Sequence, residues 1–223
     1  MTSLLDNGFG IFENVLTSAE CDALLSALSE RADGGKAGSR NLISNESVQS
    51  LVDDERLVVI AKRFLGASAV PYKATLFDKS AETNWLVPWH QDRVLPIKRR
   101  SLDAGWGPWT RKEGIEFAHA PSWAMARIVA LRIHLDESTP ENGPLRVIPS
   151  SHRLGVLEQK ELVDRARRST EMMCTVGKGG IIAMRPLLIH ASSKSNSDAP
   201  RRVLHVEYVD SLQLADGIEL AFS

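Results

Sequence analysis

Trp89-His90-Gln91-Asp92, which follows Asn84-Trp85-Leu86-Val87-Pro88, is the stretch that decides how this chain is interpreted. In a β-strand alternate side chains share a face, so the histidine and the aspartate point one way and the glutamine points the other. A second histidine from far along the chain would complete the facial triad of a non-haem iron(II) site, which leaves three coordination positions open. His190 is the candidate for that ligand. The alternative is a strand face on which His90 and Asp92 only hydrogen-bond, with His190 a buried core histidine.

The chain beyond Gly66 has the alternation that is typical of short β-strands. The expected strands cover residues 70–79, 87–92, 126–136, 145–149, 172–176, 181–184 and 203–209. Turn sequences rich in glycine, proline and asparagine separate them, such as Pro140-Glu141-Asn142-Gly143-Pro144. Only one later helix is expected, near residues 157–168. The pattern favours a closed or sandwiched β architecture over a parallel α/β sheet.

The N-terminal part is expected to be helical. After a short entry strand over residues 8–12, Thr17-Ser18-Ala19-Glu20 forms a capping box and predicts a helix that ends near Gly34-Gly35. Residues 38–42 are expected to be a loop or a short strand. Apolar positions at helical spacing predict a second helix over residues 53–65. We therefore expect a single domain over residues 1–223, with a helical part over about 1–66 and a β core over about 70–210.

Composition restricts the classes of partner. The 223 residues contain 27 Lys and Arg against 28 Asp and Glu, which gives no general attraction to nucleic acid or to anionic membranes. Cys21 and Cys174 are far apart in the sequence, which argues against a disulfide scaffold or a zinc site. The N-terminus lacks a signal-peptide pattern, and no apolar run approaches the roughly 18 residues that span a bilayer. We expect a cytoplasmic protein whose partner is a small molecule, with no nucleic acid and no membrane.

Arg201 lies eleven residues beyond His190, at the start of the last expected strand. A 2-oxo acid can chelate a metal through its keto oxygen and adjacent carboxylate, and dioxygen then takes the remaining position. If the 2-oxo acid is a dicarboxylate, its far carboxylate needs a fixed cation, and a guanidinium provides two parallel charge-assisted hydrogen bonds. The alternative for Arg201 is a surface ion pair, and strand alternation allows only one of Arg201 and Arg202 to point inward.

Three sequence pieces together resemble a known family. They are His90-Gln91-Asp92, Asn142-Gly143-Pro144-Leu145-Arg146-Val147-Ile148-Pro149-Ser150-Ser151-His152, and His190-Ala191-Ser192 with Arg201. In order and spacing, over roughly residues 70–208, they resemble the phytanoyl-CoA dioxygenase family of iron(II)/2-oxoglutarate oxygenases. The resemblance implies a mainly β protein with a double-stranded β-helix core (jelly-roll, cupin-like) and flanking N-terminal helices. It also implies His90, Asp92 and His190 as iron ligands, with Arg201 and Ser192 holding the far carboxylate of 2-oxoglutarate.

The chain departs from the family pattern at two points. The family usually has Gly-Ser-His after the Asn-Gly-x-Leu-x-Val-x-Pro segment, and here Ser150 stands at the glycine position. The chain is also short for the family, so part of the usual substrate cover is expected to be absent.

Further polar residues are candidates for the same cavity. Lys79 shares a strand face with Thr75 and Phe77, and Arg40 can reach the cavity from the N-terminal part; both are candidates to bind 2-oxoglutarate or an anionic substrate. Arg132 and His134 share one face of the strand over residues 126–136. This face is either exposed to solvent or lines a polar pocket in a small barrel, and in the pocket Arg132 is a further candidate for 2-oxoglutarate.

The segment over residues 93–123 has no clear period and mixes tryptophans with basic residues. Long irregular loops in compact domains are often lids or binding loops. The segment is therefore interpreted either as a lid over an anionic or amphipathic small molecule or as a surface loop whose tryptophans pack on the barrel.

The function that these features predict is hydroxylation of an unactivated C–H bond of a small molecule. The expected cofactor is iron(II), the co-substrates are 2-oxoglutarate and dioxygen, and the co-products are succinate and carbon dioxide. Two alternatives stay open: a non-catalytic metabolite-binding or sensing module that keeps the metal site, and a cupin-type metal-dependent isomerase or hydrolase that does not use 2-oxoglutarate.

Overall fold

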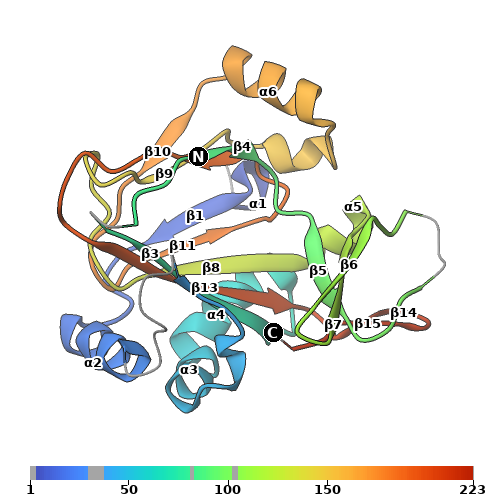
Figure 1. Ribbon diagram of the computed structural model, residues 1–223, viewed down its shortest axis with the longest axis horizontal. Helices are drawn as coiled ribbons and strands as arrows, with labels where there is room; N and C mark the ends of the chain where they lie inside the picture. The colour runs from blue at the N-terminus through green and yellow to red at the C-terminus, as the bar shows by residue number, and fades with distance from the viewer. Residues whose placement is uncertain (1–3, 30–37, 81–82, 102–104, 223) are drawn as a thin grey trace.

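Two facing antiparallel sheets form the centre of the protein (Figure 1). The computed structural model describes residues 4–29, 38–80, 83–101 and 105–222. The larger sheet has the strand order β1-β11-β8-β13-β3-β2 and the smaller sheet β10-β9-β12-β4. From β3 onward the chain passes between these two sheets at nearly every step, which is the winding of a double-stranded β-helix. The expected fold class is confirmed.

The larger sheet consists of β1 (Phe9–Phe12), β2 (Gly38–Ser39), β3 (Val70–Lys79), β8 (Ile128–His134), β11 (Ile181–Met184) and β13 (Arg201–Val209). The smaller sheet consists of β4 (Val87–His90), β9 (Leu145–Val147), β10 (Met172–Cys174) and β12 (His190–Ser192). The last two strands, β14 (Gln213–Ala215) and β15 (Ile218–Glu219), form a separate hairpin. The helices are α1 (Leu4–Asn7), α2 (Ser18–Ser29), α3 (Glu46–Val52), α4 (Glu55–Leu65), α5 (Ser122–Met125) and α6 (Gln159–Arg168), with 3₁₀ turns η1 (Leu42–Ser44) and η2 (Ser151–Leu154).

Helices α2, α3 and α4 cover the outer face of the larger sheet (Figure 1). The capping box is present at the start of α2, where Glu20 N–H donates to Thr17 Oγ1 and Thr17 N–H donates to Glu20 Oε2. The buried Leu24 and Leu57 of these helices pack in one cluster with sheet residues such as Leu131. Each such side chain contributes about 1.5–3 kcal/mol when it is fully buried. The end of the first helix, expected near residues 34–35, lies outside the described residues.

Strand β13 shows why the larger sheet has a polar inner face. Leu204 and Val206 point outward into the helix-covered cluster, whereas Arg201, His205 and Glu207 point to the other side and line an internal cavity. Both faces are therefore buried, and a charge buried in this way is stable only when it is paired or hydrogen-bonded. The fold places a row of ionisable side chains where an apolar core would otherwise be expected.

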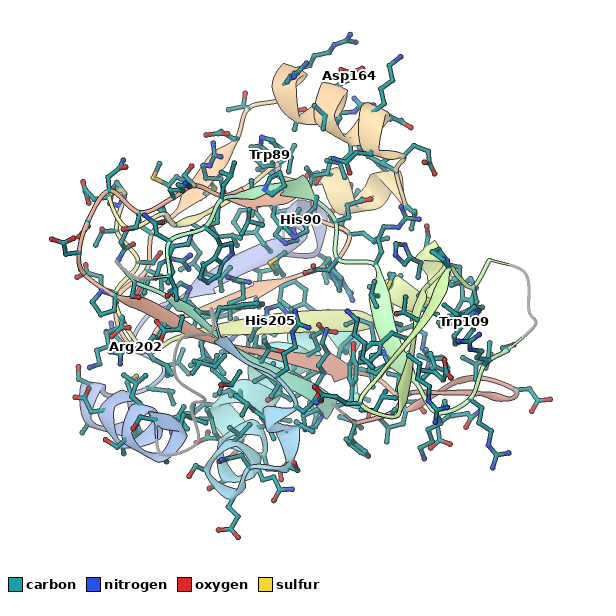
Figure 2. The ribbon with its side chains drawn as sticks, viewed as in Figure 1. Trp89, His90, Trp109, Asp164, Arg202 and His205 are labelled. Carbon is teal, nitrogen blue, oxygen red and sulfur yellow. The ribbon has the colours of Figure 1, made fainter. Side chains whose placement is uncertain are left out.

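The smaller sheet brings the two candidate histidines together. In the register of β12 and β4, His190 lies directly opposite His90. Trp89 and Ile189, the residues directly before the two histidines, point the other way into a cluster beneath α6. Figure 2 shows Trp89 and His90 on opposite sides of the smaller sheet. The alternation therefore directs both imidazoles toward the larger sheet.

The structure corrects two sequence predictions. Strand β4 ends at His90, so Asp92 lies in the segment after it, where its N–H donates to the carbonyl of Pro186. In the described parts of residues 93–123, the expected irregular loop is instead a three-stranded antiparallel sheet of β5 (Val94–Ile97), β6 (Trp109–Lys112) and β7 (Ile115–His119), followed by α5. Among the described residues, the longest helix falls short of the length and apolar character that crossing a membrane requires.

Candidate metal and co-substrate site

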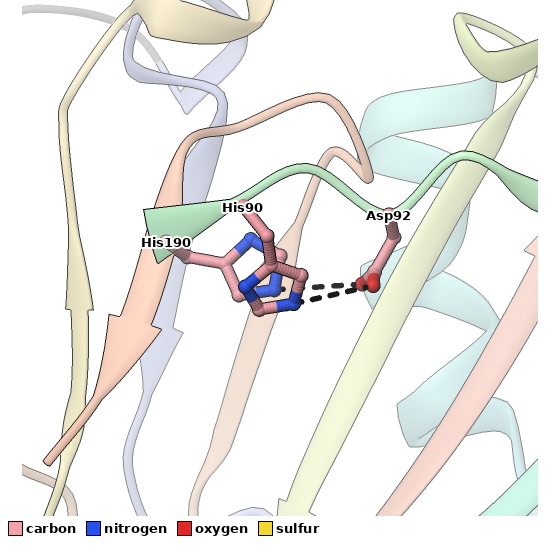
Figure 3. A group of neighbouring side chains, drawn as sticks. All are labelled: His90, Asp92 and His190. Atoms are coloured by element: carbon pink, nitrogen blue, oxygen red, sulfur yellow. Dashed lines mark ion pairs between the residues drawn. The ribbon is translucent and has the colours of Figure 1, made fainter. Parts of the chain in front are cut away.

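His90, Asp92 and His190 converge at one point inside the barrel (Figure 3). One ligand atom from each lies within 4.8 Å of the others. His90 Nε2 is 3.6 Å from Asp92 Oδ1, and His190 Nε2 is 3.5 Å from Asp92 Oδ2. Two imidazole nitrogens and one carboxylate oxygen are the donor set of a facial triad, so these residues can hold a divalent metal ion.

Backbone carbonyls orient both imidazoles. His90 Nδ1 donates to the carbonyl of Pro88 at 2.9 Å, and His190 Nδ1 donates to the carbonyl of Leu188 at 2.8 Å. A proton held on Nδ1 leaves the Nε2 lone pair free for a metal, which is the usual arrangement in metal sites. Both Nε2 atoms are also those that face Asp92. The backbone therefore selects the ligating tautomer of each ring.

Charge and burial act on the three ligands in different directions. Burial lowers the pKa of His190 to about 3. Burial also acts against ionisation of Asp92, but the two neighbouring imidazoles hold the pKa of that carboxyl well below its usual range. The partly exposed His90 is desolvated too, yet its hydrogen bond to Asp92 and that residue's charge raise its pKa. The site thus presents a neutral His190 and an ionised carboxylate, the forms that bind a metal.

Gln91 fixes the backbone between the two ligands His90 and Asp92. Its side chain points away from His90 and Asp92, as the alternation predicts, and donates from Nε2 to the carbonyls of Gly155 and Leu187. Its Oε1 accepts from the N–H of Leu157. These three hydrogen bonds fix the backbone that follows His90. Because this backbone is fixed, Asp92 is held next to the two histidines although it lies beyond the end of β4.

The triad lines a cavity of about 340 Å³ between the two sheets. Strands β3 and β13 supply its floor through three directly opposed pairs, Lys79 with Arg201, Thr75 with His205 and Lys73 with Glu207, together with Phe77. The smaller sheet supplies the histidines and Ser192. The lining of the cavity has four cationic side chains, namely Lys73, Lys79, Arg132 and Arg201. It also has two carboxylates, Asp92 and Glu207. Apart from its histidines, the lining therefore has two net positive charges.

Arg201, Lys79 and Ser192 meet at one end of the cavity. Arg201 Nη2 and Lys79 Nζ both donate to Ser192 Oγ, at 3.2 and 2.9 Å, and that hydroxyl donates to the carbonyl of Gly143. Arg201 Nε donates to the carbonyl of Asn142. Desolvation, reinforced by neighbouring arginine charges, lowers the pKa of Lys79 to about 8 and that of Arg201 to about 10. We call these three residues the cationic anchor.

Arg202 points out of the cavity and forms a two-point ion pair with Asp136. Arg201 is only 4% exposed, and its Nη1 has no hydrogen-bond partner among the described residues. A buried guanidinium nitrogen without a partner costs free energy unless a ligand satisfies it. Of the two adjacent arginines, Arg201 is thus the one that faces the cavity, and its free nitrogen indicates that an anion belongs there.

Arg132 and His134 are both buried, so the solvent interpretation of their strand face is wrong. Arg132 lines the cavity and its Nη1 lies 3.3 Å from His205 Nδ1, while its Nε has no partner within the described residues. Both ring nitrogens of His134 are likewise without partners there. Burial and the charges of Arg132 and Arg201 hold the pKa of His134 well below its ordinary value.

The remaining candidate, Arg40, is exposed and is not among the residues that line the cavity. The inward pair that sequence reasoning missed is Lys73 and Glu207, which form an ion pair of 2.7 Å. A signal for Glu207 was present, because it shares strand parity with Arg201 and His205. Identifying Lys73 as its partner requires the register of β3 against β13, which the sequence does not show.

Comparison with known proteins identifies the family of the chain. Residues 4–203 match the family model described as phytanoyl-CoA dioxygenase (PhyH). L-proline trans-4-hydroxylase of Streptomyces griseoviridis is 27% identical over a 190-residue alignment, and the match covers 74% of this chain and 63% of that protein. The chain therefore spans less than two thirds of the length of this relative.

Solved structures share the fold at lower sequence identity. EctD from S. alaskensis has a TM-score of 0.69 at 21% identity, with 92% of this chain and 74% of that chain covered. AviO1 from Streptomyces viridochromogenes has a TM-score of 0.65 at 23% identity, with 93% and 91% covered. EctD has been crystallised with iron, and also with 2-oxoglutarate and 5-hydroxyectoine. The family match spans far more than half of the chain, and the protein belongs to the phytanoyl-CoA dioxygenase family.

Proposed function

We propose that this protein is an iron(II)- and 2-oxoglutarate-dependent oxygenase that hydroxylates an unactivated C–H bond of a small molecule. Succinate and carbon dioxide are the proposed co-products. The observation that carries the proposal is that the His90, Asp92 and His190 cluster and the cationic anchor open into one cavity. The similarity to L-proline trans-4-hydroxylase supports a small-molecule substrate.

The proposed metal ligands are His90 Nε2, His190 Nε2 and one carboxylate oxygen of Asp92. Bound iron(II) would supply the activation of dioxygen, which no protein side chain provides. The protein's own contribution is to hold three donors on one side of the ion and to keep both imidazoles in the ligating tautomer through the carbonyls of Pro88 and Leu188. Three protein donors would leave coordination positions for the co-substrates.

2-Oxoglutarate suits the charge and the hydrogen-bond donors of the cavity. Its two carboxylates match the two net positive charges of the lining. The far carboxylate is proposed to bind the cationic anchor, where Arg201 Nη1 lacks a partner among the described residues and Ser192 Oγ lies between two cations. Arg132, with its free Nε, is proposed to contribute a further positive charge. Arg40 is not proposed to bind 2-oxoglutarate, because its side chain is exposed.

Apolar side chains limit the access of water to this end of the cavity. Phe77, Val87 and Leu145 line it between the two sheets. The ring of Trp85 lies against Lys79, with Nζ 5.4 Å from the ring centroid. In such surroundings each charge interaction with 2-oxoglutarate is stronger than it would be in water. Neither a metal-only isomerase nor a metal-only hydrolase needs a buried anchor of this kind, so the anchor favours the oxygenase.

The direct test is calorimetric titration of 2-oxoglutarate into the protein, followed by an assay of succinate formation with iron(II). We expect binding, and a slow succinate formation that requires both iron(II) and 2-oxoglutarate. Arg201→Gln is expected to abolish both signals. If the protein binds iron(II) but does not bind 2-oxoglutarate, the proposed oxygenase activity is ruled out. Binding without any succinate, across a broad panel of small molecules, would point to the sensing module.

A further inference from the structure

Lys73 and Glu207 lie directly opposite each other on β3 and β13, at the far end of the inward row from the cationic anchor. Glu207 lies six positions beyond Arg201, which is about 20 Å along a strand at ~3.3 Å per residue. Their charged groups form an ion pair of 2.7 Å, and both residues line the cavity. The two ends of one cavity thus carry different chemistry: cations alone at one end, and a cation with an anion at the other.

The metal ligands lie between these two ends. On β12, Ser192 belongs to the cationic anchor, and His190, two residues earlier, belongs to the metal cluster. Lys73 borders a second hollow of about 300 Å³ together with His90 and Asp92. A co-substrate that reaches from the metal to the anchor therefore leaves the end with Lys73 and Glu207 for the molecule to be oxidised.

The surroundings of Glu207 are built to keep it ionised. Tyr72 Oη donates to its Oε2, and His205 Nε2 lies 3.4 Å from its Oε1. Burial acts against ionisation, yet Lys73 and His205 lower the pKa of Glu207 to about 2. Replacing a buried ion pair by apolar side chains is often neutral or stabilising, so stability alone is a weak reason for this pair. A binding role accounts better for an ion pair that borders open space.

We propose that Lys73 and Glu207 recognise the substrate, and that this substrate is a small zwitterion of the amino-acid type. Its carboxylate binds Lys73 and its ammonium group binds Glu207. The proposal rests on the proposed function, because it assigns the substrate end of that same cavity.

A zwitterion is favoured because each of the two buried charges must keep a partner of opposite charge when the substrate binds. A simple carboxylic acid would draw Lys73 away and leave Glu207 with a buried charge that lacks its cation. A simple amine would draw Glu207 away and leave Lys73 with a buried charge that lacks its anion. Leaving one member of a buried pair uncompensated is costly, so each of these ligands is disfavoured. A molecule with both groups replaces one internal pair by two intermolecular pairs and leaves no charge alone.

The test compares three forms of one ligand. The twenty free L-amino acids are first screened for acceleration of succinate formation and, by calorimetry, for binding. The best amino acid is then compared with its analogue without the amine and with its analogue without the carboxylate. The wild-type protein is expected to prefer the amino acid at least tenfold over both analogues, in kcat/KM and in Kd. Glu207→Gln should abolish the preference over the amine-free analogue, and Lys73→Gln the preference over the carboxylate-free analogue.

The matched control is Lys98→Gln, which removes a lysine from the exposed ion pair with Glu219 outside the cavity. It should retain both preferences. Because each preference is a ratio measured within one variant, partial loss of folded protein does not change it. If Glu207→Gln does not fold, the result with Lys73→Gln decides. Should 2-oxoglutarate bind while no amino acid binds or accelerates succinate formation, the zwitterion is overturned and the oxygenase stands. Absence of 2-oxoglutarate binding overturns both proposals.

Discussion

Arg201 and Lys79 lie directly opposite each other on β13 and β3, and both donate hydrogen bonds to the hydroxyl of Ser192. Two cations that share one hydroxyl acceptor repel each other in a buried site. Among the described residues that line the cavity, no carboxylate pairs with either of them. The arrangement is costly without an anion and favourable with one. We therefore propose that this pair is a preformed receptor for a carboxylate.

Arg201→Gln is expected to weaken 2-oxoglutarate binding by about 30-fold or more, because truncating one partner of a buried charge pair costs roughly 2–5 kcal/mol. Arg202→Gln is the matched control, since Arg202 points outward and pairs with Asp136. It should change the affinity less than threefold. Calorimetric titration of 2-oxoglutarate into both variants is the measurement, and equal losses in the two would contradict the assignment.

The affinity for 2-oxoglutarate should fall as pH rises above about 8. Desolvation and the nearby Arg201 and Arg132 lower the pKa of Lys79 to about 8, so its positive charge is present below that pH and is lost above it. A bound dianion raises the pKa of Lys79 again, and by linkage the affinity decreases about tenfold per pH unit above 8 until that higher pKa is reached. Calorimetry between pH 7 and 9.5 measures the decrease.

Lys79→Met provides the comparison for this pH dependence. It should bind 2-oxoglutarate more weakly at pH 7, and with an affinity that is nearly constant across the same range. A decrease above pH 8 that persists in Lys79→Met would assign the titration to another group.

Gly143 ties the turn of residues 140–144 to the cationic anchor. Its φ is +70°, and a Cβ at this position would lie 2.4 Å from the carbonyl oxygen of Ser193 and 3.2 Å from Lys79 Nζ. Gly143→Ala is therefore expected to displace the anchor and to weaken 2-oxoglutarate binding at least tenfold, besides destabilising the fold. Gly217→Ala has the same φ and no neighbour within 4 Å, so it carries only the backbone cost of about 1–2 kcal/mol. If both variants keep full affinity, the turn does not position the anchor.

Much of the fold and of the site followed from strand alternation. The expected strands over residues 70–79 and 181–184 have the same bounds as β3 and β11. Alternation also allowed only one of Arg201 and Arg202 to face inward, and the spacing from His190 favoured Arg201, which is the one in the cavity. These predictions held because a buried sheet with a helix-covered outer face leaves little freedom in the direction of each side chain.

The rest depends on contacts that sequence patterns do not encode. Asp92 faces the histidines because Gln91 and the carbonyl of Pro186 hold a segment beyond the strand, not because the strand continues. The pairing of Lys73 with Glu207 depends on register between strands far apart in the sequence. Along strands β5, β6 and β7 buried and exposed residues do not alternate, so the period-2 pattern that indicates a strand is absent there.

Removal of one ligand from the metal cluster should abolish specific metal binding. Losing an outer partner of a metal ligand alone costs about 10–100-fold in affinity, so His190→Ala is expected to cost more than about 100-fold. His152→Ala is the control, because His152 lies outside the metal cluster. Anaerobic titration with iron(II) measures both variants. Dialysis of the wild-type protein against a chelator should stop succinate formation, and iron(II) should restore it; unchanged iron(II) affinity in His190→Ala would exclude the triad.

Ser150→Gly is expected to stabilise the protein. Ser150 occupies the position where the family has glycine, and it adopts the left-handed conformation with φ 66° and ψ −1°, which costs a non-glycine residue about 1–2 kcal/mol. Glycine removes that strain but has a larger conformational entropy in the unfolded chain, so the net gain should be about 0.5–1 kcal/mol. Ser151→Gly should have the opposite effect, because Ser151 Oγ donates to the carbonyl of Ile148 and accepts from the N–H of Ile189. Urea unfolding measures both free energies, and a destabilising Ser150→Gly would mean that the serine side chain contributes more than its backbone strain costs.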